Sequence, residues 1–226
     1  MSSPNRTQPG DAMSGSGSLH TDAQLRKDAY GASARKETIV DRYGIWLSGY
    51  QIRRRIKSFD GLRVADIGCG HHARFTSRIL DRVQSALLAD ITLSRALKSH
   101  PKVRALEGYL PEVLFEVESA SQDLVMCISV LEHIWDPLGA LKELRRILAP
   151  GGTLLISVPT WRGKWFLEFS AFRLKTSPAE EMDDHKMYYE LQTFWPLLVQ
   201  AGFLPHQIRC YRYKFGIGLF SVCKLA

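Results

Sequence analysis

The chain has 226 residues, of which 45% are hydrophobic and 23% are charged, and its formal net charge is +7. A globular protein of this length and composition can bury a large core without disulfides or metal ions. No apolar run approaches the ~20 residues of a membrane-spanning helix, and the N-terminal segment lacks the apolar stretch of a secretory signal. We therefore predict a cytoplasmic protein that has no membrane span.

Cysteine spacing and charge distribution argue against two further classes of site. The four cysteines are Cys69, Cys127, Cys210 and Cys223. They form no CxxC pair and no Cys/His zinc spacing, so we predict neither a disulfide nor a metal site. The basic residues are dispersed, and the densest cluster, at residues 53–57, has no basic tail or nucleic-acid motif beside it. Such a cluster is typical of a solvated helix face.

The N-terminal quarter of the chain divides into two predicted segments. Residues 1–20 are rich in Ser, Gly, Pro and Asn, and we predict a disordered tail because they offer little apolar surface to bury. Residues 21–60 are predicted to form a helical cap. Apolar residues recur there at spacings of three and four, which is typical of a helix: Ile39, Tyr43, Trp46, Leu47 and Tyr50. This helix either covers a bound ligand or merely covers the sheet.

From residue 61 to residue 226 the pattern predicts one α/β domain. Short apolar runs at 62–67, 85–90, 103–106, 123–129 and 153–158 alternate with amphipathic stretches such as 74–83 and 137–148. This alternation predicts βαβ units in a doubly wound, Rossmann-like and mostly parallel sheet. A helix over 189–201 precedes two strand-like runs, 203–213 and 215–224, whose connection is too short for a crossover. One strand near the C-terminus should therefore be antiparallel.

The segment VADIGCGHH, residues 64–72, predicts a strand followed by a tight glycine turn. Gly68 and Gly70 would let the backbone turn sharply and approach a ligand, and a helix N-terminus with unpaired N–H groups would follow. The same pattern also occurs in turns that bind nothing. It is not the GxGxxG of dinucleotide-binding proteins, because Ala73 stands in the place of the third glycine.

Asp90 ends the next predicted strand, 20 residues after Gly70. Ligands of parallel α/β sheets bind beyond the carboxyl ends of the strands, where a carboxylate can accept hydrogen bonds from both ribose hydroxyls. The alternative is that Asp90 simply caps the following helix.

The order and spacing of VADIGCG, ALLAD, DLVMCISVLEHIWDP and LRRILAPGG resemble those of class I S-adenosylmethionine-dependent methyltransferases, particularly the small-molecule subgroup. The resemblance covers residues 60–160 and extends more loosely to the end of the chain. It implies a Rossmann-like fold, S-adenosylmethionine as cofactor and methyl transfer as the reaction. The chain departs from the family at His72, where a second turn glycine is frequent, and at Tyr109, where Asp is frequent.

The resemblance also implies where the cofactor would lie. The implied contacts are Asp66, Gly68, Cys69 and Gly70 at the methionine, Ile128 and Ser129 near the methyl group, Asp90 at the ribose, and Ile91, Gly108, Tyr109 and Leu110 at the adenine. Tyr43 and Trp46 of the expected cap would add aromatic contacts, which suit a cationic sulfonium.

An oxygen acceptor needs a group that takes its proton, and histidine suits that role. His133 and His185 are the candidates, and the alternative for each is a structural or solvated histidine. An aromatic-rich insert at about 160–188 either packs as core or roofs an acceptor pocket. We expect a small-molecule or glycan acceptor and no nucleic acid. The alternatives are an NAD-dependent oxidoreductase, which the missing third glycine disfavours, and a non-catalytic S-adenosylmethionine-binding module.

Overall fold

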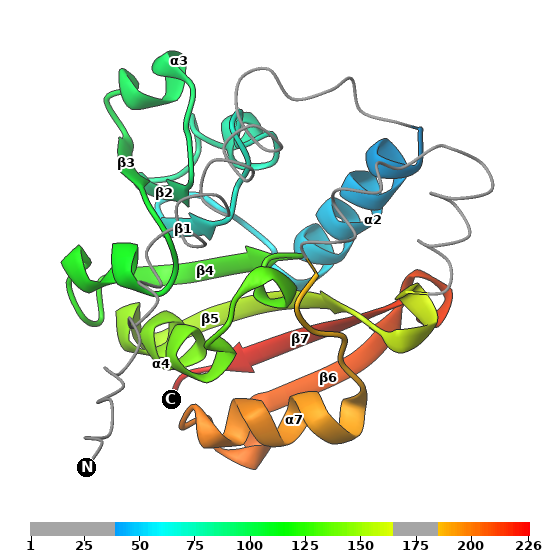
Figure 1. Ribbon diagram of the computed structural model, residues 1–226. Coiled ribbons are helices and arrows are strands. Elements are labelled where there is room, and N and C mark those ends of the chain that lie inside the picture. Colours follow the sequence, from blue (N-terminus) through cyan, green and yellow to red (C-terminus); the bar gives the residue numbers. More distant parts are fainter. Residues whose placement is uncertain (1–38, 165–184) are drawn as a thin grey trace, which may run out of the picture.

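The computed structural model describes residues 39–164 and 185–226, and it describes side chains from residue 44 onward in the first of these ranges. The predicted tail over 1–20 and most of the predicted insert at 160–188 lie outside the described residues. Figure 1 shows the arrangement of the described elements around one twisted sheet.

Seven strands form a single sheet in the order β3-β2-β1-β4-β5-β7-β6. Their bounds are β1 Arg63–Ile67, β2 Ser85–Asp90, β3 Val103–Glu107, β4 Gln122–Ile128, β5 Leu148–Pro159, β6 Ile208–Tyr213 and β7 Gly218–Lys224. β7 is antiparallel to both β5 and β6, and every other neighbouring pair is parallel. The predicted fold class, a mostly parallel Rossmann-like sheet with one antiparallel strand near the C-terminus, is confirmed.

The central strands are mostly apolar because both faces of the sheet are covered. Successive residues of β4 point to opposite faces, so Val125 and Cys127 join one buried cluster while Leu124 and Met126 join the other. Strands covered on both faces lose the alternation of polar and apolar residues that an exposed face would impose. The apolar runs in the sequence therefore mark the strands well.

Helices α4 (Pro137–Ile147) and α7 (Leu191–Gln200) cover one face of the sheet (Figure 1). The Asp136 side chain begins α4 by accepting a 2.8 Å hydrogen bond from the N–H of Gly139, and Pro137 occupies the first turn. Leu141 and Leu144 of α4 and Phe194 of α7 are fully buried in the shared cluster. Both helices were predicted and are confirmed. No described helix is long and apolar enough to cross a membrane.

Helix α2 (Ile39–Arg55) covers the other face of the sheet. The side of α2 that is buried is not the aromatic stripe that the sequence pattern marks. Ser48 and Ile52 are buried, whereas Trp46 is 59% exposed and stacks on Tyr50 at 6.1 Å between ring centroids. Gly49 is buried on the same side, and a Cβ there would lie 3.4 Å from the ring of Phe75, at an ordinary contact distance. The side of α2 that packs on the protein therefore carries the small residues Ser48 and Gly49.

The predicted α-helix over 74–83, with its N-terminus after the glycine turn, is wrong. The described chain forms turns there and a short 3-10 helix, η1 (Thr76–Arg78). The hydroxyl of Thr76 donates to Asp66, and the hydroxyl of Ser77 donates to the backbone oxygen of His72. Such side-chain bonds compete with a regular helix.

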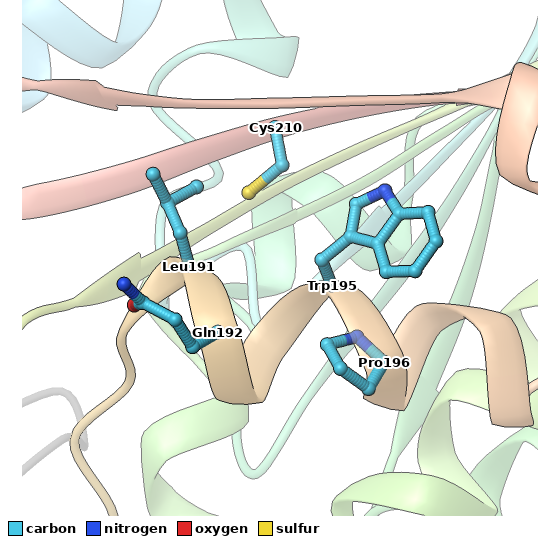
Figure 2. Close-up of a pocket in the computed structure, with 5 residues that line it drawn as sticks. All are labelled: Leu191, Gln192, Trp195, Pro196 and Cys210. Atoms are coloured by element: carbon cyan, nitrogen blue, oxygen red, sulfur yellow. The ribbon is translucent and has the colours of Figure 1, made fainter.

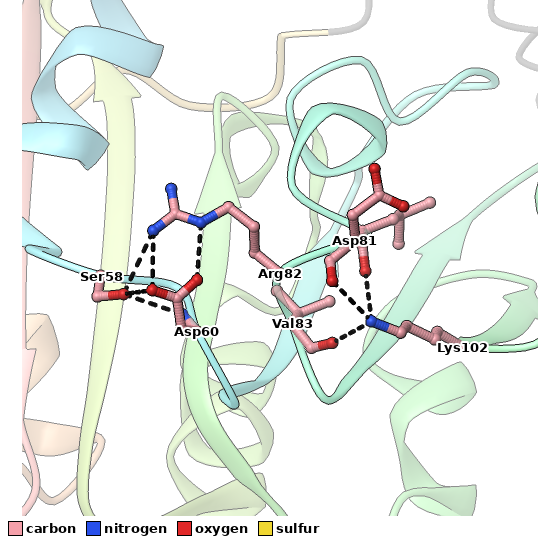
Figure 3. A network of polar contacts seen from close by, with 7 residues as sticks. Ser58, Asp60, Asp81, Arg82, Val83 and Lys102 are labelled. Atoms are coloured by element: carbon pink, nitrogen blue, oxygen red, sulfur yellow. Dashed lines mark hydrogen bonds and ion pairs between the residues drawn. The ribbon is translucent and has the colours of Figure 1, made fainter.

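A network of polar contacts holds this turn segment where β1 and β3 begin (Figure 3). The ammonium of Lys102 donates to the backbone oxygens of Leu80, Asp81 and Val83 at 2.8–3.1 Å. Arg82 pairs with Asp60 at 2.8 Å on the exposed side. These contacts lie at the amino ends of the strands, opposite the edge at which ligands of such sheets bind.

Candidate active site

The candidate site lies along the carboxyl ends of β2, β1 and β4, which are neighbours in the middle of the sheet. β1 ends at Ile67, β2 at Asp90 and β4 at Ile128, and the three strands are parallel. Ligands of open parallel sheets bind at this edge. The chain therefore brings the glycine turn, the acidic residue and the LEH segment to one place, although they are far apart in the sequence.

The glycine turn after β1 requires glycine for two different reasons. Gly68 and Gly70 have φ values of +70° and +74°, a region that strains residues with a Cβ. A Cβ at Gly68 would also lie 2.2 Å from the Cγ2 of Val130, which follows β4, while a Cβ at Gly70 would meet no atom within 4 Å. Gly68 thus allows the two loops to touch, and Gly70 faces open space.

Asp90 fastens the end of β2 to this turn. One carboxylate oxygen accepts the N–H of Gly70 at 2.7 Å and the other accepts the N–H of Ile91 at 2.8 Å. Burial raises the pKa of Asp90, and these backbone hydrogen bonds partly offset that rise. The alternative reading of Asp90 as a helix cap is wrong, because Ser94 caps the next helix, α3 (Arg95–Lys98).

Asp66 is buried beneath the turn and serves to position it. The hydroxyl of Thr76 donates to its carboxylate at 2.5 Å, and burial raises the pKa of Asp66 to about 6. Cys69 lies next to it, and burial raises the pKa of its thiol well above the usual range. We did not predict the role of Thr76, since no motif marks a hydroxyl ten residues after the aspartate.

The residues implied at the adenine lie together beside Asp90. The N–H of Gly108 donates to the backbone oxygen of Asp90 at 3.1 Å. The backbone pairing of β2 with β3 therefore continues one residue beyond the end of β3. Tyr109 is 39% exposed, and Leu110 and Ile91 are half-buried. The ends of β2 and β3 thus offer two short segments that could hold a flat ring between them.

The end of β4 turns sharply at Ser129, whose φ is +56°. Its N–H donates to the backbone oxygen of Ser157 in β5 at 2.9 Å, which holds the turn against the sheet. Ile128 is half-buried beside the second core cluster. Trp46 lies on the exposed side of α2, and the side chain of Tyr43 lies outside the described residues.

His133 and His185 are brought together, which the sequence alone did not predict. The backbone oxygen of Glu132, in the 3-10 helix η3 (Leu131–His133), accepts the N–H groups of Lys186 at 2.7 Å and Met187 at 3.3 Å. These bonds draw the segment before α7 against η3. The two imidazole rings consequently lie 4.8 Å apart between centroids.

Tyr188 and Trp161 add aromatic surface beside the histidine pair. The Tyr188 hydroxyl lies 3.0 Å from Nδ1 of His185, and the Tyr188 ring lies 5.4 Å from that of Trp161. Trp161 is 53% exposed, so this aromatic surface faces outward. It is one described part of the predicted aromatic insert.

Glu132 is a site residue that we did not single out from the sequence. It is only 2% exposed, and its Oε2 has no hydrogen-bond partner among the described residues. Burial raises the pKa of Glu132 to about 7, while the neighbouring His133 lowers it. The LEH segment that follows β4 is the signal in the sequence that could have indicated Glu132.

A hollow between α7 and β6 lies elsewhere on the molecule (Figure 2). It is lined by Leu191, Gln192, Trp195, Pro196 and Cys210. β6 is the outermost strand, and β5 and β7 separate it from β4. This hollow therefore belongs to the edge of the sheet and not to the candidate site.

The Gly68 contact yields a stability prediction with a matched control. We expect Gly68→Ala to lower the free energy of unfolding by about 2–4 kcal/mol, from backbone strain of ~1–2 kcal/mol plus overpacking against Val130. Gly61→Ala is the control, since Gly61 has a φ of +71° and no neighbour within 4 Å of an added Cβ. It should show the strain alone. Equal losses in urea denaturation would mean that the contact with Val130 imposes no constraint.

Comparison with known proteins identifies the family. The family described as "Methyltransferase domain" matches residues 45–208. Ubiquinone biosynthesis O-methyltransferases are similar: that of Xanthomonas campestris is 33% identical over 106 residues, 43% of each chain. That of Maricaulis maris is 30% identical over 137 residues, 58% of this chain and 50% of the relative. The chain spans about half the length of the curated relatives it matches.

Among solved structures, 1,6-didemethyltoxoflavin-N1-methyltransferase of Burkholderia thailandensis has a similar fold, with a TM-score of 0.59 and 15% identity. The alignment covers 96% of this chain and 94% of that one. The family match spans the glycine turn, Asp90 and the segment after β4, the same features that form the candidate site. The chain belongs to the class I methyltransferase family, whose methyl donor is S-adenosylmethionine.

Proposed function

We propose that this chain transfers the methyl group of S-adenosylmethionine to an oxygen atom of a small molecule or sugar unit. The observation that carries the proposal is the contact between the two halves of the site. Val130 packs against Gly68 of the glycine turn, and His133 follows Val130 by three residues. The cofactor segments and the histidine pair are thus parts of one short stretch of the sheet edge.

The residues at this edge suit the cofactor. Each carboxylate oxygen of Asp90 accepts one strong backbone hydrogen bond and retains capacity for a ribose hydroxyl. The open side of Gly70 suits the methionine part, with Asp66, Gly68 and Cys69 around it. Ile91 and the segment 108–110 would hold the adenine, and Ile128 and Ser129 would lie near the methyl group. Trp46, which is exposed on α2, would add an aromatic contact to the cofactor.

The bound cofactor supplies an activated methyl group on a cationic sulfur. The chain must hold an acceptor oxygen in line with that group and keep it there, which is catalysis by proximity and orientation. The bond from sulfur to methyl breaks, the bond from oxygen to methyl forms, and the acceptor oxygen loses its proton. His133 and His185 would assist that loss.

Two observations favour a small oxygen acceptor. Tyr188 and Trp161 offer aromatic faces beside the histidine pair, and such faces stack on flat or sugar rings. The two ubiquinone biosynthesis enzymes named above are O-methyltransferases. Family membership leaves the NAD-dependent oxidoreductase without support. The remaining alternative, a binding module without activity, is distinguished by turnover with radiolabelled S-adenosylmethionine and a panel of phenols, catechols and sugars.

Replacing Asp90 tests the ribose assignment. We expect Asp90→Asn to weaken binding of S-adenosylhomocysteine by about 1.5–3 kcal/mol, because charged hydrogen bonds to the ribose are lost. Isothermal titration measures this directly. Asp123→Asn is the control, because Asp123 pairs with Arg63 at 2.6 Å at the start of β4 and should leave the affinity unchanged. Unchanged affinity in Asp90→Asn would refute the assignment.

Replacing the histidines tests the acceptor side. We expect His133→Ala or His185→Ala to lower turnover of an oxygen acceptor by ~10²–10⁴-fold while cofactor affinity stays the same. His206→Ala is the control, since His206 is exposed in η4 (Pro205–Gln207) beside β6. Full activity in both Ala variants would show that neither histidine assists proton loss.

A further inference from the structure

We propose that Glu132, His133 and His185 bind a divalent transition-metal ion at the acceptor side of the cleft. Binding itself is independent of the proposed function, but the role we give the ion rests on that function. The three side chains each offer one ligand atom, and these atoms all lie within 4.8 Å of one another. Spacing in the sequence gives no sign of this site, because His185 lies 52 residues after His133.

The three ligands are held close by the backbone and need only side-chain adjustment. Ligand atoms around a tetrahedral Zn²⁺, with bonds of about 2.0–2.2 Å, lie roughly 3.4 Å apart. Rotation of the three side chains by about an ångström at their ends would reach that spacing from the separations present. The backbone oxygen of Glu132 already accepts the N–H groups of residues 186 and 187, so the two segments that carry the ligands are held together.

The environment of Glu132 is a second, independent indication that a cation binds here. Its side chain is 98% buried, and its Oε2 has no hydrogen-bond partner within the described ranges 44–164 and 185–226. A buried carboxylate oxygen without a partner is costly, and coordination of a metal ion is one way to compensate that cost. The same carboxyl group lies beside two imidazoles, which are the commonest metal ligands in proteins.

The surroundings of His185 also resemble a metal site. A metal-binding imidazole is oriented by a hydrogen bond from its second nitrogen. The Tyr188 hydroxyl, 3.0 Å from Nδ1 of His185, can make that bond. Tyr188 is in turn packed beside Trp161, so the orienting group is itself held in place.

The ligand set indicates the kind of ion. Two nitrogen ligands and one carboxylate suit Zn²⁺, Co²⁺, Fe²⁺ or Mn²⁺, whereas Mg²⁺ and Ca²⁺ prefer oxygen ligands throughout. Three protein ligands leave at least one coordination position open, as in catalytic metal sites. In the proposed function that position takes the acceptor hydroxyl, whose proton is then lost more easily to solvent. The two histidines would thus assist proton loss as ligands.

Co²⁺ is the probe that tests the site, because its visible absorption reports the ligands. We expect one equivalent of Co²⁺ to bind the full chain with visible bands of nitrogen and oxygen coordination and no thiolate charge-transfer band. Glu132→Gln and His185→Ala should each lose that spectrum, and His206→Ala should keep it. Glu132 is buried, so Glu132→Gln could lose the spectrum by misfolding. His185→Ala keeps the test decisive, because His185 is only half-buried in a connecting segment.

Absence of the spectrum in the full chain, or its persistence in His185→Ala, would overturn the proposal. Methyl transfer measured with and without a strong chelator separates this failure from failure of the proposed function. Histidine-dependent turnover that survives chelation would refute the metal ion and leave the proposed function standing. The expected cobalt spectrum in a chain that methylates no oxygen acceptor would support the metal site and refute the function.

Discussion

The candidate site depends on the Asp90 carboxylate, which accepts hydrogen bonds from the N–H groups of Gly70 and Ile91. The bond to Gly70 holds the end of β2 against the turn after β1. It therefore fixes the relative position of the two segments between which a cofactor would lie. The turn can reach this position only because Gly68 permits contact with Val130. A ligand bound there would therefore meet groups that are already in place.

The strands and the helices α4 and α7 could be predicted because the local sequence pattern of each segment agrees with its place in the fold. Burial on both faces makes the strands mostly apolar runs, and Asp136 with Pro137 marks the start of α4. The helix over 74–83 could not be predicted correctly, since its amphipathic pattern does not show that Thr76 binds Asp66. The aromatic stripe of α2 likewise does not show that the buried side of this helix carries Ser48, Gly49 and Ile52.

The proposed cofactor half of the site was more predictable than the proposed acceptor half. Glycine turns and strand-end carboxylates follow from the topology of parallel sheets, so Gly68, Gly70 and Asp90 could be found from spacing alone. The cluster of Glu132 with His133 and His185 depends on backbone bonds between η3 and the segment before α7. No local pattern encodes those bonds, because their two sides are separated by more than fifty residues.

The most direct test of the central claim, that the carboxyl edge of β1 and β2 binds the cofactor, is amide hydrogen exchange with and without S-adenosylhomocysteine. Our account predicts slower exchange in peptides covering 66–73, 90–92 and 107–111, and no change over 191–213. Protection confined to 191–213, around the hollow between α7 and β6, would contradict it, as would the absence of any protection at saturating ligand.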